Sequence, residues 1–288
     1  MYPVPFEYHR AGSVQEAVEL LARYGEWGKL LAGGHSLLPL MKLRMAEPRH
    51  LVDIRRIPGL SGVREEAGAL VIGAATTHQT LERSPLVRQR LRILSEAASQ
   101  IGDAQVRNMG TIGGSLAHAD PAADLPAVML AVGAELVAVG PKGKRTIAVD
   151  GFFLKLFTTT LLPGEVLTEV RIPLPPAGTG GAYAKFPHPA SRYAIVGVAA
   201  MVTVAARKIA AARVAITGVG AKAVRASGTE SALVGAGAEA GVLASAAEKA
   251  PQGLTVRSDP RMDPDYWRAL AVTFTRRALT TALERAGG

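Results

Sequence analysis

Two glycine-rich segments decide how this chain of 288 residues folds: LAGGHSL at residues 31–37 and GTIGGS at residues 110–115. Each contains a Gly-Gly pair beside a small hydroxyl-bearing residue. Because glycine has no Cβ, such a pair predicts a concave turn whose successive backbone amides are open to an anion. One turn of this kind suits one phosphate. Two of them predict a pyrophosphate held between two loops, and so a dinucleotide.

The first segment has the surroundings of an anion site. The apolar run at 29–32 predicts a short buried strand, and residues 37–43 have the spacing of a helix that tolerates Pro39 only in its first turn. Gly33 to Ser36 would then lie at a helix N-terminus, where the helix dipole and unpaired amides favour an anion. Taken singly, either Gly-Gly pair is more often an ordinary tight turn.

The residues around both segments resemble those of a known family. AGGHSLLPLMKLRMAEPRHLVDI, from residue 32, and GTIGGSLAHADPAADLPAVMLAV, from residue 110, are similar to the FAD-binding medium subunits of the molybdenum-containing hydroxylases. That family includes aerobic carbon monoxide dehydrogenase, and the flavin segment of xanthine dehydrogenase is related. The resemblance implies an α+β chain: a two-part αβ FAD-binding domain of the vanillyl-alcohol-oxidase/PCMH type, then a smaller α+β C-terminal domain with a sheet and helices.

The resemblance also implies which residues hold FAD, without a covalent link. The pyrophosphate would lie between the two loops and bind mainly their backbone amides. Asp124 matches a carboxylate near the ribityl or phosphate part, and Lys185 matches a cation that would stabilise the reduced ring. Leu161, or its neighbour Leu162, would lie by the ring and Tyr193 would cover it. The predicted cofactor-binding residues are Ala32, Gly33, Gly34, His35, Ser36, Leu37, Thr111, Gly113, Gly114, Ser115, Asp124, Leu161, Lys185 and Tyr193.

Several of these residues also have a purely structural interpretation. Asp124 could be the N-cap of a helix whose first turn contains Pro126. Lys185 could be a surface lysine on a sheet edge, and Tyr193 could be ordinary core packing. These alternatives stay open on the sequence alone.

Other motifs are weaker. Residues 218–223 fit a nicotinamide-dinucleotide fingerprint after a strand, but the helix would stop by residue 228 and no second strand would complete the βαβ unit, so a strand end and turn is the better interpretation. His118, Asp120 and Asp124 lack the further histidines of a metal site, and we predict none. The family does not support a histidyl flavin link at His35.

The organisation predicted is an FAD-binding domain at 1–176, with subdomains of about 1–55 and 56–176, and a C-terminal α+β domain at 177–288. A capping box at Ser13 and Glu16 predicts the first helix. Strands are predicted near 51–54, 70–72, 135–139, 145–149, 166–172, 194–206 and 213–217. Helices are predicted near 91–99, 230–234, 241–250 and 264–285, and a linker at 173–181.

Composition limits the function classes. The chain has no cysteine, so it can hold neither a cysteine-ligated iron–sulfur cluster nor a cysteinyl flavin. We expect no signal peptide and no membrane span, because the N-terminus lacks an apolar segment and the longest apolar run, 194–206, is too short. The net charge is +9, but the basic residues of the last third of the chain are scattered, which favours a solvated face or contact with an acidic partner over nucleic-acid binding. We predict a cytoplasmic protein, which its partners could hold at the inner face of the membrane.

The function that follows is electron relay. A large molybdenum-cofactor subunit would oxidise the substrate, a small [2Fe-2S] subunit would pass single electrons, and FAD on this chain would deliver pairs to a quinone, NAD or oxygen. No catalytic residue is predicted here, and a homodimer of the isolated chain stays open. The alternatives are a stand-alone flavin oxidoreductase of the same fold and a non-redox nucleotide-binding module.

Overall fold

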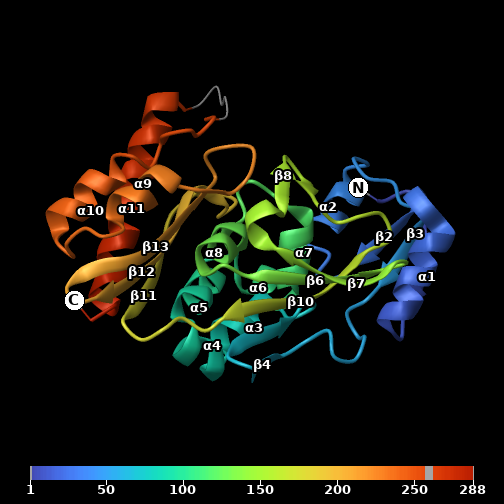
Figure 1. Ribbon diagram of the computed structural model, residues 1–288. Coiled ribbons are helices and arrows are strands. Elements are labelled where there is room, and N and C mark those ends of the chain that lie inside the picture. Colours follow the sequence, from blue (N-terminus) through green and yellow to red (C-terminus); the bar gives the residue numbers. More distant parts are fainter. Residues whose placement is uncertain (1, 257–261, 288) are drawn as a thin grey trace.

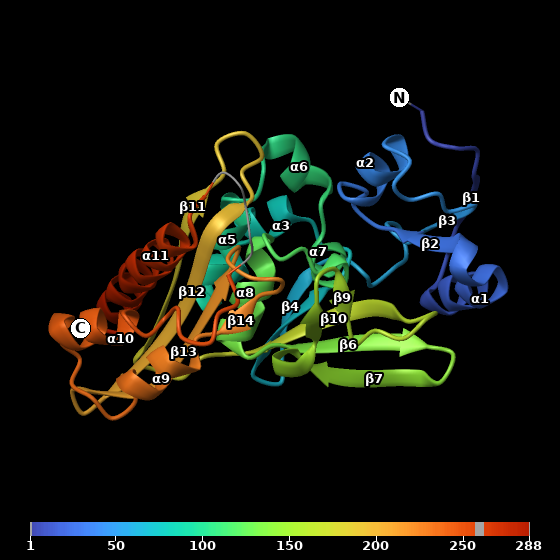
Figure 2. The ribbon, with the colours of Figure 1, turned by 90° about the horizontal axis from the view of Figure 1, so that it is seen from above.

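The computed structural model describes residues 2–256 and 262–287. Its described part contains three sheets and one two-stranded ribbon. In both views, the N-terminal unit in blue and the C-terminal unit in orange and red lie on opposite sides of a central unit (Figures 1 and 2). The three units occupy consecutive parts of the chain.

The N-terminal unit is a small parallel sheet. Its strands are β1 (Glu7–Arg10), β3 (His50–Asp53) and β2 (Gly28–Leu31), in that order across the sheet. Helix α1 (Val14–Tyr24) begins at Ser13, whose Oγ accepts the Glu16 amide at 3.0 Å as the capping box predicts. The Glu16 carboxylate reaches back to the amide of Gly12 at 2.7 Å, one residue earlier than the standard motif. A 3₁₀ turn (Gly25–Trp27) follows, and α2 (Leu37–Lys42) comes after β2 with Pro39 in its first turn.

The central unit is a five-stranded antiparallel sheet covered by short helices. Its strand order is β4 (Val63–Glu66), β5 (Ala69–Gly73), β10 (Val166–Pro173), β6 (Glu135–Gly140) and β7 (Gly143–Ala148). The helices are α3 (His78–Arg83), α4 (Pro85–Arg90), α5 (Arg92–Ser99), α6 (Ala104–Met109), α7 (Ile112–His118) and α8 (Asp124–Val132); a 3₁₀ turn (Val149–Gly151) and the ribbon of β8 (Phe153–Lys155) and β9 (Thr158–Thr159) complete the unit. Helix α8 is apolar on all sides, and accordingly it is buried along almost its whole length.

The C-terminal unit is an antiparallel sheet of β11 (Thr179–Pro187), β12 (Ala194–Ala205), β13 (Lys208–Thr217) and β14 (Val224–Arg225), with α9 (Ser227–Leu233), α10 (Ala240–Ala247) and α11 (Pro264–Arg285). Helix α11 packs on β11 and β12. It approaches so closely that a Cβ on Gly180 would lie 2.5 Å from the Ala286 amide nitrogen, which explains a glycine inside a strand.

The predicted α+β class is confirmed by these elements. One detail differs from the sequence analysis, and one confirms it. Between Pro173 and Thr179 only residues 174–178 lie outside strands, so the predicted linker is too long. After β13 the chain turns into the antiparallel strand β14 rather than into a helix, which confirms that the fingerprint-like glycines at 218 and 220 form a strand end and turn. No helix among residues 2–256 and 262–287 combines the length and the apolar character that crossing a bilayer requires.

Candidate functional site

The first glycine loop offers open backbone donors. It connects β2 to α2, and Ser36 stands at the N-cap of α2 without using its side chain as a cap. Within the part of the chain that the structure describes, the amides of residues 33–36 donate no hydrogen bond. His35 contacts the loop from inside, with Nδ1 3.1 Å from the carbonyl oxygen of Gly33. A run of unpaired amides is what an anionic ligand requires.

The second glycine segment differs from its prediction. Gly113 and Gly114 lie inside the first turn of α7 and form no open nest, because Thr111 begins this helix. The Gly113 amide donates to the carbonyl of Ala74 at 2.8 Å, and the Gly114 amide donates to Thr111 Oγ1 at 3.1 Å. In the described chain, the Thr111 amide is the one backbone amide of residues 110–115 with no acceptor. The prediction that both glycine pairs expose successive amides is therefore wrong for the second pair.

The two loops touch each other, which the sequence did not predict. A Cβ on Gly33 would meet the carbonyl oxygen of Met109 and would lie 2.7 Å from the Cα of Gly110. On the other side, a Cβ on Gly114 would lie 3.9 Å from the Cβ of Ala32. Gly33 is thus required for the contact between the loops as well as for access to any ligand.

Tyr193 reaches this pair of loops from the C-terminal sheet. It ends the turn between β11 and β12, which the His188 amide closes by donating to the Tyr193 carbonyl at 2.8 Å. Burial and the carboxylates of Asp120 and Asp124 raise the pKa of the Tyr193 phenol, and the neighbouring Ser36 hydroxyl partly opposes this rise. Tyr193 as a whole is still 42% exposed. Tyr193 is therefore positioned as a partly open cover on the first loop, not as core packing.

Removal of either the Tyr193 or the Ser36 hydroxyl should weaken FAD binding about fivefold. We expect a hydrogen bond between these neighbouring hydroxyls, worth about 1 kcal/mol, and Tyr193→Phe and Ser36→Ala each remove it. Because both substitutions remove the same bond, the double variant should bind no more weakly than Tyr193→Phe alone. Equilibrium titration of the FAD-free protein measures this, with Tyr266→Phe, an exposed tyrosine of α11, as the matched control. Additive losses in the double variant would show that the bond does not matter.

Asp124 and Lys185 form a buried ion pair that joins the central and C-terminal units. The Lys185 ammonium donates to the two oxygens of Asp124 at 2.9 and 3.0 Å and to the Gln100 carbonyl at 3.0 Å. The Tyr183 hydroxyl donates to the same carboxylate at 2.5 Å. The side chains of Lys185 and Asp124 are only 1% and 5% exposed. The positive charge of Lys185 is therefore compensated inside the protein.

This arrangement corrects two alternatives from the sequence. Lys185 lies on β11 at the sheet edge, but its side chain is buried, so it is not a surface lysine. Ala123 is the N-cap of α8, and Asp124 is its first helical residue; its carboxylate is engaged with the neighbouring sheet. Burial raises the pKa of the Asp124 carboxyl, although Lys185 and Tyr183 both favour its ionised form.

The remaining predicted residues are placed as follows. Leu161 is partly buried and packs against the central core, with no described contact to the other predicted residues. The preceding loop is held against α7 by a ring contact between Phe157 and His118. Asp120 accepts the amide of Ala122 at 2.8 Å, which accounts for it as a turn residue. Leu37 begins α2, and Ser115 lies within the first turns of α7.

The sequence analysis missed His78, a buried residue between the loops. Its amide donates to the Gly110 carbonyl at 2.9 Å, and its Nδ1 has no partner among the described residues. Burial, with the charges of His35 and Arg107, lowers the pKa of its imidazole to about 4, so the ring is neutral near pH 7. The sequence marks His78 only as the residue that follows Thr77, the N-cap of α3.

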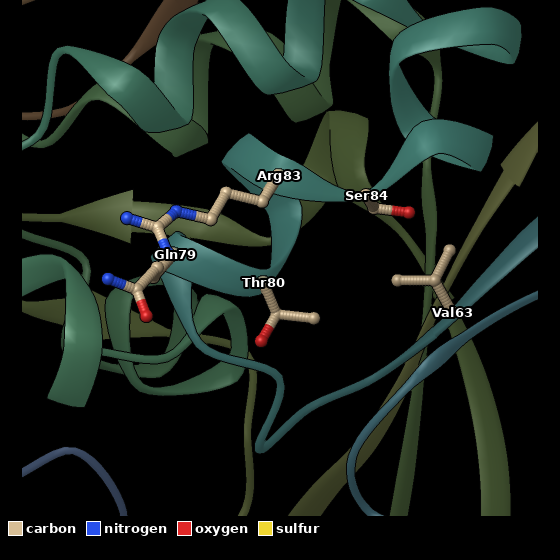
Figure 3. A pocket seen from close by; sticks show the side chains of 5 residues that line it. All are labelled: Val63, Gln79, Thr80, Arg83 and Ser84. Carbon is tan, nitrogen blue, oxygen red and sulfur yellow. The ribbon is translucent and has the colours of Figure 1, made fainter.

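Two surface hollows lie away from these residues. The first, of about 450 Å³ and shown in Figure 3, is open and is lined by Val63, Gln79, Thr80, Arg83 and Ser84. In Figure 3 the side chains of Gln79 and Arg83 lie on one side of it and Val63 on the other. The second, of about 420 Å³, lies between the central and C-terminal units beside Asp150 and Lys222. No predicted cofactor-binding residue lines either hollow.

The groups present fit a bound dinucleotide at the first loop. The amides of residues 33–36 and of Thr111, which have no acceptor among the described residues, lie on two loops that contact each other, and Tyr193 from the C-terminal sheet is close to Ser36. Donors without partners favour a phosphate. No acid, base or nucleophile of these residues is arranged as a triad for substrate chemistry.

Both parts of the chain match known protein families. The family described as the FAD binding domain in molybdopterin dehydrogenase matches residues 4–175, and the CO dehydrogenase flavoprotein C-terminal domain matches residues 181–282. The carbon monoxide dehydrogenase medium chain of Hydrogenophaga pseudoflava is 46% identical over 285 residues, which cover 99% of each chain. The 6-hydroxypseudooxynicotine dehydrogenase complex subunit alpha of Paenarthrobacter nicotinovorans is 41% identical, over 99% of this chain and 97% of that one. A solved carbon monoxide dehydrogenase from Hydrogenophaga pseudoflava superposes with a TM-score of 0.96 at 47% identity, again over 99% of each chain.

Proposed function

The chain belongs to the family of FAD-binding medium subunits of molybdenum-containing dehydrogenases of the carbon monoxide dehydrogenase type, and from this premise we propose that it is the electron-relay subunit of such a complex. It would take electrons from iron–sulfur clusters of a partner subunit and deliver them to an external acceptor. When bound, FAD supplies the ability to accept electrons singly and release them as a pair.

The observation that carries the proposal is the open first loop, whose amides at residues 33–36 have no partner in the described chain. We propose that this loop and the Thr111 amide hold the pyrophosphate, with Gly113, Gly114 and Ser115 shaping the second wall. Tyr193, whose hydroxyl is close to that of Ser36, would exclude water from one side of the flavin. Asp124 and Lys185 would fix the turn that carries Tyr193, and Leu161 would contribute apolar surface.

We propose that the two domains contribute different parts of the cofactor site. Residues 1–176 would carry both cofactor loops, and residues 177–288 would supply Tyr193 and Lys185 from one sheet. The boundary between the first two subdomains would lie near Arg55, just after β3. The matched family segments, 4–175 and 181–282, support this division.

Dependence on partner subunits is supported by chemistry that the chain lacks. It has no cysteine, so a cysteine-ligated cluster must reside on another subunit. The names of the two relatives above refer to different substrates, carbon monoxide and 6-hydroxypseudooxynicotine, although both chains align over almost their full length. We infer that a large molybdenum-cofactor subunit selects the substrate and that a small [2Fe-2S] subunit links it to this chain.

The isolated, FAD-loaded chain should therefore show no turnover with carbon monoxide, purines or small aldehydes. Its flavin absorbance at about 450 nm should decrease only when the large and small subunits are added together with the substrate of the complex. Stopped-flow absorbance measures this, with each partner omitted in turn as the control. Steady turnover by the single chain would instead make it a stand-alone flavin oxidoreductase.

A further inference from the structure

A second cluster of ligand-type side chains lies on the N-terminal sheet. Glu7 and His9 are on the edge strand β1, and His50 is on the central strand β3. In the parallel register Glu7 is paired with His50, and His9 is two residues further along β1. Because alternate residues of a strand point to the same face, all three side chains project together. None of them belongs to the cofactor site described above.

The three ligand atoms form an almost equilateral triangle. His9 Nε2 lies 3.2 Å from His50 Nδ1, and Glu7 Oε2 lies 3.5 Å from the first and 3.3 Å from the second. A tetrahedral Zn²⁺ site has metal–ligand distances of about 2.0–2.2 Å, and the edge of a tetrahedron is about 1.6 times that distance, or about 3.2–3.5 Å. The observed triangle thus has the size of one face of a zinc coordination tetrahedron.

Hydrogen bonding alone accounts poorly for this triangle. If both facing ring nitrogens carry protons, both can donate to Glu7, but the two N–H groups then face each other; hydrogen bonds therefore join at most two of the three pairs. A single cation above the triangle contacts all three atoms at once, and its fourth position would remain for water because Glu7 is exposed. Two imidazoles and one carboxylate are a donor set that zinc uses in proteins.

The imidazoles are held in place by Tyr24, the last residue of α1. Its ring stacks on His50 with centroids 3.7 Å apart and planes at 9°, and on His9 at 4.9 Å and 26°. The two histidine side chains are 23% and 20% exposed, so they are partly shielded but reachable. Stacking fixes the rings before any ion arrives, which lowers the entropic cost of binding.

We propose that Glu7, His9 and His50 form a binding site for a divalent transition-metal ion, with Zn²⁺ as its best match. The ion would join the edge strand β1 to β3, the strand that also pairs with β2, which leads into the first glycine loop. The role of the ion would be structural, because the site lies on the N-terminal sheet and consists only of its three ligands. Mg²⁺ should not compete, since it prefers oxygen ligands in an octahedral arrangement.

The test is a Zn²⁺ titration of the chelator-stripped, FAD-loaded protein against a chromophoric chelator. The wild type should bind one ion with an affinity that Mg²⁺ does not reduce. Loss of a partner outside the coordination sphere already costs about 10–100-fold in affinity, so His9→Ala and His50→Ala should each weaken binding at least tenfold. His188→Ala, which removes a partly exposed histidine of the β11–β12 turn far in sequence from the cluster, should leave the zinc affinity unchanged.

Two further measurements keep the test decisive. Glu7→Gln changes only an exposed side chain, so it cannot act through misfolding, and it too should lower the zinc affinity. Anomalous diffraction from zinc-soaked crystals should place the ion within about 2.2 Å of the three ligand atoms. If Glu7→Gln and His50→Ala bind zinc as tightly as the wild type, the cluster is only a hydrogen-bonded surface group and the proposal is wrong.

Discussion

Replacing Gly33 by valine should abolish FAD retention during purification. The new side chain would begin where the carbonyl of Met109 and the Cα of Gly110 already lie, and both are backbone atoms that cannot rotate away. It would force the two loops apart and would also enter the space in front of the open amides. Overpacking of a tight contact costs about 1–3 kcal/mol, which corresponds to an affinity loss of about 5- to 150-fold when the binding conformation bears it.

The controls for this experiment come from glycines that are free of contacts. Gly151 has ordinary backbone angles and open space around its Cβ position, so Gly151→Val should retain full flavin. Gly34→Val should also lose FAD, but Gly34 has a φ of +75°, at which any side chain is strained. Gly59→Val, at φ +81° with no neighbour, is its control because it introduces the same backbone strain outside the loop. Full flavin occupancy in Gly33→Val would show that the first loop does not hold the cofactor.

Much of the fold was predictable because local signals agree with the tertiary structure. The first glycine loop was correctly expected between a strand and a helix with Pro39 in its first turn. The Ser13 cap and the long final helix, Pro264–Arg285, also follow from sequence. In each case the interactions that form the element join residues close together in the chain, so capping residues and hydrophobic periodicity predict it.

The site was less predictable because its geometry depends on contacts between distant segments. A Gly-Gly pair looks the same in an open loop and in the first turn of a helix, so the closed state of the second pair could not be predicted. Gly113 is a glycine because a Cβ there would lie 2.7 Å from the Ala74 carbonyl oxygen. Likewise, nothing near Lys185 in the sequence indicates its partner Asp124, which is 61 residues away.

Replacing Lys185 by methionine should destabilise the protein strongly and make its stability depend on pH. The substitution keeps most of the side-chain volume but leaves the Asp124 carboxylate buried without its cation, and breaking a buried pair in this way costs about 3–5 kcal/mol. Without Lys185 the pKa of Asp124 should rise further, because burial already raises it and Lys185 is the strongest opposing influence. The folded-state pKa then lies above the unfolded value near about 3.9.

The sign of the pH effect follows from that shift. A group whose pKa is higher in the folded state binds its proton more tightly there, so the stability of Lys185→Met is greatest at low pH and is lost as pH rises through the folded pKa. Urea unfolding should show a small deficit against the wild type at pH 5 and a larger one at pH 8. Asp124→Asn in the Lys185→Met background removes the buried charge while the amide oxygen can still accept from Tyr183, and should restore most of the lost stability. A Lys185→Met variant whose deficit is constant with pH, or that Asp124→Asn does not rescue, would mean that the lysine acts by packing alone.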